Sequence, residues 1–178
     1  MSGAKRVILN EQQITAALDD MVVRILEKNK SGDQLAVVGI HTCGVFLAKR
    51  IRRIILDKTG IEVPYGSLDI NLYRDDWSII TQSPIVRTTE ISFEVEEKHL
   101  ILVDDVFFTG RTIRSAMNAL MDYGRPKSIQ LAILVERDGR ELPIRPDYVG
   151  MDTVMCGSEK IQVLLKERDE RDEVIVES

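Results

Sequence analysis

The feature that most constrains this chain is residues 100–112, which read LILVDDVFFTGRT. Four apolar residues lead into two adjacent carboxylates, Asp104 and Asp105, and a Thr-Gly-Arg-Thr turn follows before apolar residues recur at helical spacing. This order predicts a buried strand, an acidic pair at its carboxyl end, and a loop that opens a helix. Helix N-termini bind phosphate through free N–H groups and the macrodipole. The stretch therefore predicts a ligand that carries phosphate together with hydroxyl groups or a metal ion.

The rest of the chain predicts an α/β fold. Near-continuous apolar segments at residues 35–40, 100–103 and 130–135 alternate with amphipathic helices, which is typical of a parallel sheet covered on both faces. The first helix follows Asn10, which can form a capping box with Gln13, and two more helices begin near residues 44 and 112. Shorter strands are predicted at residues 68–72, 90–95, 148–151 and 161–165, and a solvated turn at 167–173 precedes a final edge strand at 174–176.

Length and charge limit the classes of protein to which this chain can belong. The 178 residues are enough for one domain with a sizeable core, and no repeat or linker divides residues 1–178. The net charge of −5 means that nucleic-acid binding would need a local basic patch. The two cysteines match no zinc spacing, and no signal peptide or membrane span is recognisable. We therefore expect a cytoplasmic protein with reduced thiols and no membrane association.

The predicted site lies where parallel strands end. Ligands of open parallel sheets bind beyond the carboxyl ends of the strands, so the loops after residues 40, 103 and 135 are expected to meet. Asp104 and Asp105 can accept hydrogen bonds from the hydroxyls of a ribose or offset a bound cation. The N–H groups and hydroxyls of residues 109–112 can enclose a phosphate, and Gly110 permits close approach. The alternative is that the acidic pair is only a polar strand exit and that the threonines are only caps. A Walker A loop is absent.

These residues resemble the phosphoribosyl pyrophosphate (PRPP) signature of the type I phosphoribosyltransferases. Residues 69–76, 124–126, 129–135 and 140–145 further resemble the PyrR family of pyrimidine regulatory proteins, and the likeness runs from about residue 7 to 176. The resemblance implies a central, mostly parallel sheet flanked by helices, a small hood, a long flexible β-hairpin loop at about residues 73–89, and C-terminal strands at about residues 148–176. It also implies a homodimer or homotetramer.

The resemblance implies a uracil phosphoribosyltransferase, which converts uracil and PRPP into UMP and pyrophosphate. Asp104 and Asp105 would hold the ribose hydroxyls, and Arg74 and Asp75 lie on the loop that closes over PRPP; these four are the candidate catalytic residues. Mg²⁺ would be held mainly by PRPP, with no direct protein ligand. The other candidate contacts are Thr42, Cys43 and Gly44 for pyrophosphate, Val106, Phe107, Phe108, Thr109, Gly110, Arg111 and Thr112 for the 5′-phosphate, and Val135 and Arg137, within the segment 134–137, for uracil.

Two regions depart from the family pattern. The pyrophosphate loop commonly reads Gly-Ile-Lys/Arg-Thr-Arg-Gly, but residues 39–44 read GIHTCG, which predicts weaker pyrophosphate binding and weaker catalysis. Family members also bind leader RNA through a basic face. Residues 19–23, 139 and 151–152 carry acidic or neutral groups where that face has cations, so RNA binding is disfavoured. The remaining candidate RNA contacts are Arg137, Arg140 and Arg145.

Three functions therefore compete. The leading one is uracil phosphoribosyl transfer. The second is a UMP- or PRPP-sensing RNA-binding attenuator of pyrimidine genes with only residual catalysis. The third is a phosphoribosyltransferase for another base, because the motif at residues 100–112 specifies PRPP and leaves the base open.

Overall fold

A five-stranded parallel sheet forms the centre of the molecule, as expected from the apolar strands. The computed structural model describes residues 5–30, 34–70, 88–155 and 159–177. The strands lie in the order β3-β2-β4-β5-β6, and every neighbouring pair is parallel. Their bounds are β2 (Leu35–Ile40), β3 (Tyr65–Leu68), β4 (His99–Phe107), β5 (Ser128–Arg137) and β6 (Tyr148–Thr153).

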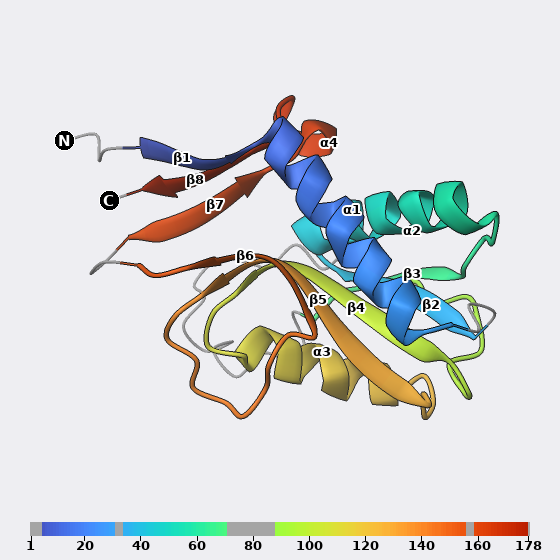
Figure 1. The fold of residues 1–178 in the computed structure, drawn as a ribbon. Helices are drawn as coiled ribbons and strands as arrows, with labels where there is room; N and C mark the ends of the chain where they lie inside the picture. The colour runs from blue at the N-terminus through green and yellow to red at the C-terminus, as the bar shows by residue number, and fades with distance from the viewer. Residues whose placement is uncertain (1–4, 31–33, 71–87, 156–158, 178) are drawn as a thin grey trace.

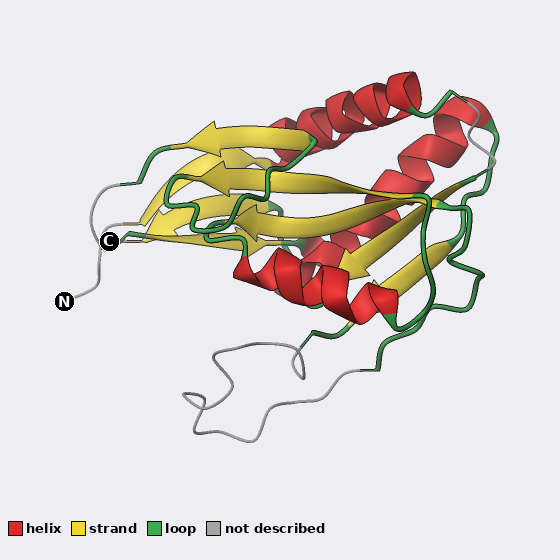
Figure 2. Ribbon diagram, turned by 90° about the horizontal axis from the view of Figure 1, so that it is seen from below, coloured by secondary structure: helices red, strands yellow, loops and turns green. Residues whose placement is uncertain are grey.

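Helices cover both faces of this sheet. The helices α1 (Glu11–Lys28) and α2 (Cys43–Thr59) lie on one face, and α3 (Arg111–Met121) lies on the other (Figures 1 and 2). The predicted capping box at the start of α1 is confirmed, because the Asn10 side chain accepts from the Gln13 amide at 3.0 Å and the Gln13 side chain accepts from the Asn10 amide at 2.9 Å. No helix in these described ranges is long and apolar enough to cross a membrane.

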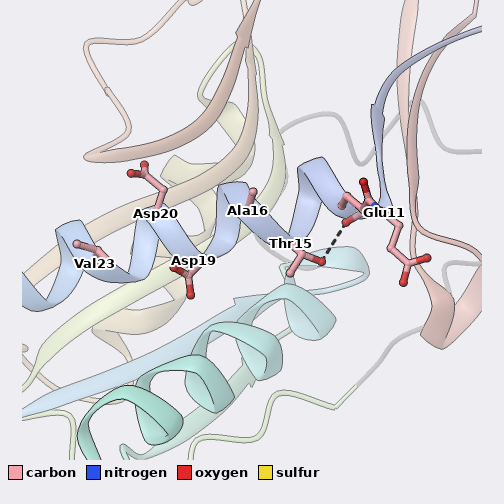
Figure 3. Close-up of a pocket in the computed structure, with 7 residues that line it drawn as sticks. Glu11, Thr15, Ala16, Asp19, Asp20 and Val23 are labelled. Carbon is pink, nitrogen blue, oxygen red and sulfur yellow. Dashed lines mark hydrogen bonds between the residues drawn. The ribbon is translucent and has the colours of Figure 1, made fainter.

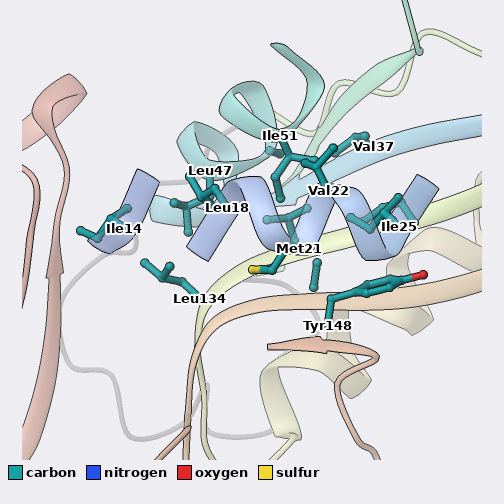
Figure 4. Packing of buried hydrophobic residues seen from close by; sticks show 14 of the residues in the cluster. Ile14, Leu18, Met21, Val22, Ile25, Val37, Leu47, Ile51, Leu134 and Tyr148 are labelled. Atoms are coloured by element: carbon teal, nitrogen blue, oxygen red, sulfur yellow. The ribbon is translucent and has the colours of Figure 1, made fainter. Parts of the chain in front are cut away.

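The main hydrophobic core lies between α1, α2 and the sheet. Leu18, Met21 and Val22 of α1 face apolar residues of α2 and of the strands (Figure 4). These side chains are 0–3% exposed. Burial of each such side chain contributes about 1.5–3 kcal/mol, so the apolar face of α1 holds the helix on the sheet far more strongly than its cap does.

A second, three-stranded antiparallel sheet matches the expected hood. Its order is β1-β8-β7, and it comprises β1 (Lys5–Asn10), β7 (Lys160–Leu164) and β8 (Glu173–Glu177). The prediction of an edge strand at residues 174–176 is wrong, because β1 pairs with β8 and makes it the central strand. Sequence reasoning missed β1, whose short apolar run has no alternation and whose partner comes from the opposite end of the chain.

Two further predictions around the sheet edge are wrong. The strand expected at residues 68–72 is β3, which ends at Leu68, and residues 71–72 lie outside the described residues together with most of the predicted flexible loop. Residues 90–95 form no strand and contribute one antiparallel bridge, between Ser67 and Glu90. Among the described residues, this segment therefore continues the sheet through a single residue pair.

The charge run at residues 167–173 is also more than a solvated turn. It contains the short helix α4 (Lys166–Asp169), which joins β7 to β8, and Asp172 is only 7% exposed. Arg50 of α2 accounts for this burial, because its guanidinium donates to both Asp172 carboxylate oxygens at 2.8 and 2.9 Å.

Candidate active site

The acidic pair lies within the last residues of β4, because the strand continues to Phe107 rather than ending before Asp104. Asp104 is 6% exposed. Its carboxylate accepts from the Asp105 amide at 3.0 Å, and that of Asp105 accepts from the Val106 amide at 2.9 Å. Burial, and then the neighbouring charge of Asp105, raise the pKa of Asp104 well above its usual range. Hydrogen-bond donors from a ligand would stabilise this pair.

The turn after β4 leads directly into α3. Gly110 is the N-cap of α3, with φ of 91°, and this residue has no side chain that could cap the helix. The Arg111 amide donates to the Thr109 hydroxyl at 3.3 Å. The Thr109 carbonyl accepts from the amides of residues 141 and 142 at 3.0 and 3.2 Å, so the segment after β5 supports this turn. A helix start without a side-chain cap is suited to a phosphate group.

The loop after β2 contacts the acidic pair through a glycine. A methyl group added to Gly44 would lie 2.4 Å from the Val103 carbonyl oxygen and 3.1 Å from the Asp104 Cα. Only glycine therefore allows the start of α2 to lie this close to β4. The structure thus brings two of the predicted segments together, residues 42–44 and residues 104–112.

We expect Gly44→Ala to lower the free energy of unfolding by about 1–3 kcal/mol, the usual cost of overpacking a rigid backbone contact. The same displacement of α2 from β4 should weaken PRPP binding. Urea denaturation and ligand titration measure the two effects. Gly60→Asn is the matched control, because Gly60 has φ of 73° and no neighbour within 4 Å of an added methyl. An unfolding midpoint for Gly44→Ala equal to that of the native chain would contradict the contact.

Cys43 is buried beside the acidic pair. Its thiol donates to the Val163 carbonyl at 3.8 Å. Burial, and then the charge of Asp105, raise the pKa of Cys43 to about 12. The thiol is therefore neutral at physiological pH, and its side chain points into the hydrophobic core rather than serving as a nucleophile.

The predicted base-contacting segment lies next to the phosphate turn. The register of β4 and β5 places Val106 beside Val135. The Arg137 guanidinium lies 4.0 Å from the centre of the Phe108 ring, and its Nη1 donates to the Glu159 carbonyl at 3.2 Å. Gly139 has φ of 110°, and a methyl there would lie 2.4 Å from the same ring. Its backbone conformation and the Phe108 ring therefore explain why this position is glycine.

The three predicted RNA contacts lie together, but carboxylates share their surface. Arg137, Arg140 and Arg145 line one hollow with Glu136, Asp138 and Asp152. Burial, and then the charge of Asp152, raise the pKa of Glu136, while the arginines act in the opposite direction. The exposed face of α1 lines another hollow with Glu11, Asp19 and Asp20 (Figure 3). Neither hollow is dominated by positive charge.

Two predicted catalytic residues, Arg74 and Asp75, lie outside the described residues. Conversely, Arg168 was not predicted as a site residue, because residues 167–173 were assigned to a solvated turn after β7. Arg168 Nη2 donates at 3.5 Å to the Val163 carbonyl, the acceptor that also receives the Cys43 thiol. No local pattern marks Arg168, because the contact depends on how the hood sheet folds against the start of α2.

Comparisons with known proteins identify the family of the chain. The phosphoribosyl transferase domain family matches residues 6–166. Bifunctional protein PyrR of Syntrophobacter fumaroxidans is 45% identical over 177 residues, covering 99% of this chain and 95% of the relative. Its namesake from Deinococcus radiodurans is 47% identical, covering 97% and 94%. Among solved structures, a hypoxanthine phosphoribosyl transferase of Trypanosoma cruzi has a TM-score of 0.76 at 16% identity and covers 100% of this chain and 93% of its own; it supports the fold alone.

Proposed function

Because the chain belongs to the phosphoribosyltransferase family and to its PyrR branch, we propose that it transfers the ribose 5-phosphate group of PRPP to uracil. The observation that carries this proposal is the buried pair Asp104–Asp105, which lies between the start of α2 and the glycine-capped start of α3. One position of the molecule thus offers acceptors for hydroxyl groups and donors for phosphate. PRPP carries both groups.

The two carboxylates accept hydrogen bonds from the 2′- and 3′-hydroxyls of the ribose. The amides and hydroxyls of residues 106–112 bind the 5′-phosphate, and these two attachments fix the orientation of the ribose C1 atom. Pyrophosphate then leaves C1 and takes the bonding electron pair, while positive character develops on the ribose. Nitrogen N1 of uracil forms the new bond to C1, and its proton passes to solvent water.

The base is expected to lie beside residues 134–137, because β5 follows β4 in the sheet and Val135 is in register with Val106. The loop at residues 42–44 is proposed to bind the leaving pyrophosphate through its backbone, because the Cys43 side chain is buried in the core. Arg74 and Asp75 remain proposed contacts of the closing loop.

Mg²⁺ is the proposed metal, bound together with PRPP. Within the described residues no group of three or more His, Cys, Asp or Glu side chains could hold a metal ion. PRPP oxygens and water are proposed to supply most of its ligands, because Mg²⁺ keeps several waters when it binds to proteins. When bound, the ion neutralises charge that develops on the leaving group.

A base panel tests this function and separates it from transfer to another base. The purified protein is mixed with PRPP, Mg²⁺ and one of uracil, cytosine, hypoxanthine or guanine, and nucleotide formation is followed by chromatography. We expect UMP from uracil and no comparable product from the other bases. A nucleotide formed faster from another base would reassign the substrate while retaining the PRPP site.

We expect leader RNA to bind weakly. Phosphate contacts supply much of the affinity of protein–RNA complexes, and carboxylates beside Arg137, Arg140 and Arg145 oppose them. A filter-binding titration with pyrimidine-gene leader RNA at low salt measures this affinity. A sub-micromolar dissociation constant that responds to UMP would favour the attenuator function instead.

A further inference from the structure

The leaving group in the proposed reaction needs positive charge at the loop after β2. Pyrophosphate becomes more negative as its bond to the ribose breaks, and nearby cations stabilise that charge. Residues 41–44 read HTCG, so this loop has no permanently charged side chain. The positive charge must therefore come from another segment or from the bound metal. Arg168 of the hood is a cation that the fold places beside this loop.

Arg168 lies beside Cys43. The Val163 carbonyl accepts from the Arg168 Nη2 at 3.5 Å and from the Cys43 thiol at 3.8 Å, so both side chains meet at one atom of β7. The hydrogen bond with Asp169 is the main cause that raises the pKa of Arg168, and the positive charge of Arg168 acts against the raised pKa of Cys43. The Arg168 side chain is 38% exposed, which leaves part of it open to a ligand.

The turn that carries Arg168 is attached to α2 by hydrogen bonds. Arg50 of α2 donates to Glu167 at 2.6 and 2.9 Å and to Asp172 at 2.8 and 2.9 Å. Within the turn, Asp169 accepts from the Leu165 amide at 3.0 Å and from Arg168 at 3.1 Å. Figure 1 shows α4 at the junction between the hood and the two helices. These contacts hold Arg168 in place before any ligand binds, which reduces the entropy lost on binding.

We propose that Arg168 binds the pyrophosphate group of PRPP and supplies from α4 the positive charge that residues 41–44 lack. This inference rests on the proposed function. A guanidinium presents several N–H donors and suits the oxygens of a phosphate group, so donors that remain beyond its contacts with Asp169 and Val163 can bind pyrophosphate. Weak pyrophosphate binding was expected because residues 39–44 lack cations. A cation from another segment was not considered.

Calorimetric titration of three ligands tests the assignment. PRPP, pyrophosphate and UMP are titrated with Mg²⁺ into the native chain and into Arg168→Gln, Arg168→Lys and Arg171→Gln. Arg171 is the matched control, because it is 60% exposed and pairs with Glu173 on the same turn. We expect Arg168→Gln to weaken PRPP and pyrophosphate binding by about tenfold or more, Arg168→Lys to retain part of the affinity, and Arg171→Gln to match the native chain.

The affinity for UMP distinguishes a role of Arg168 in pyrophosphate binding from a purely structural role. UMP carries the ribose and 5′-phosphate but no pyrophosphate, so Arg168→Gln should bind it within twofold of the native chain. Unchanged pyrophosphate affinity in Arg168→Gln, or an equal loss of UMP affinity, would overturn the proposal. Failure of the proposed function gives a different result, in which the native chain binds PRPP but forms no UMP from uracil.

Discussion

Replacing Asp104 with asparagine is expected to lower kcat/KM for PRPP by about tenfold to a hundredfold while stabilising the ligand-free protein. A hydrogen bond to a charged group contributes about 1.5–3 kcal/mol, and each 1.4 kcal/mol is a factor of ten. Asparagine keeps an oxygen that can accept from the Asp105 amide but removes the negative charge that favours the ribose hydroxyls. Initial rates of UMP formation measure the loss of activity.

The stability gain follows from the raised pKa of Asp104. Between the ordinary pKa of an aspartate and this raised value, the folded state binds more protons than the unfolded state. Stability therefore falls as the pH rises through that window, and burial of this group costs stability at neutral pH. Asparagine removes this cost. The difference in Tm between Asp104→Asn and the native chain should be positive near pH 7.5 and shrink toward pH 4.

Asp19→Asn is the control for this experiment. Asp19 lies on α1, is 51% exposed and pairs with Lys58. Its replacement should change Tm by less than a degree or two, because an exposed ion pair contributes about 0–1 kcal/mol. A Tm for Asp104→Asn below that of the native chain at pH 7.5 would show that the buried charge is stabilised in the absence of ligand.

Arg50→Ala is expected to lower the free energy of unfolding by about 3–5 kcal/mol, the usual cost of removing one partner of a buried ion pair. The Arg50 side chain is 21% exposed and that of Asp172 only 6%, so the carboxylate would be left buried with less compensation. The hood turn and Arg168 would lose their attachment to α2. Urea denaturation measures the stability, and pyrophosphate titration reports the position of Arg168.

The pH dependence of the Arg50 effect has a defined sign. Arg50 is the leading cause that lowers the pKa of Glu167, and it also lowers that of Asp172 against the effect of burial. This stabilisation is present above the unfolded pKa values and is lost as the pH falls through the folded values. The gap between Arg50→Ala and the native chain should therefore close below about pH 4. Arg53→Ala is the control, because Arg53 is 72% exposed; an equal loss in both variants would contradict the account.

Local patterns predicted those parts of the fold that depend on neighbouring residues. The capping box at Asn10 and Gln13, the buried strand at residues 35–40 and the order of acidic pair, turn and helix after residue 103 are each contained in a short segment. The resemblance added the hood and the expected course of the chain around the site. The family comparisons support the fold class.

Features that depend on distant contacts could not be predicted in the same way. The strand β1 forms because β8 lies beside it, and β8 becomes central for the same reason. Asp172 lies in a run of charged residues that predicts a solvated turn. It is nevertheless buried, because Arg50 of α2 binds its carboxylate. Arg168 lies beside Cys43 only because the hood sheet folds against α2. In each case the partner lies far away in the sequence.

Uracil-dependent release of pyrophosphate from PRPP tests the central claim most directly. The native chain and the double variant Asp104→Asn/Asp105→Asn are each mixed with PRPP and Mg²⁺, and pyrophosphate is followed before and after uracil is added. We predict that the native chain releases one pyrophosphate per UMP only after uracil is present, and that the double variant releases at least a hundredfold less per unit time. No uracil-dependent release by the native chain, or equal rates in the two proteins, would contradict the account.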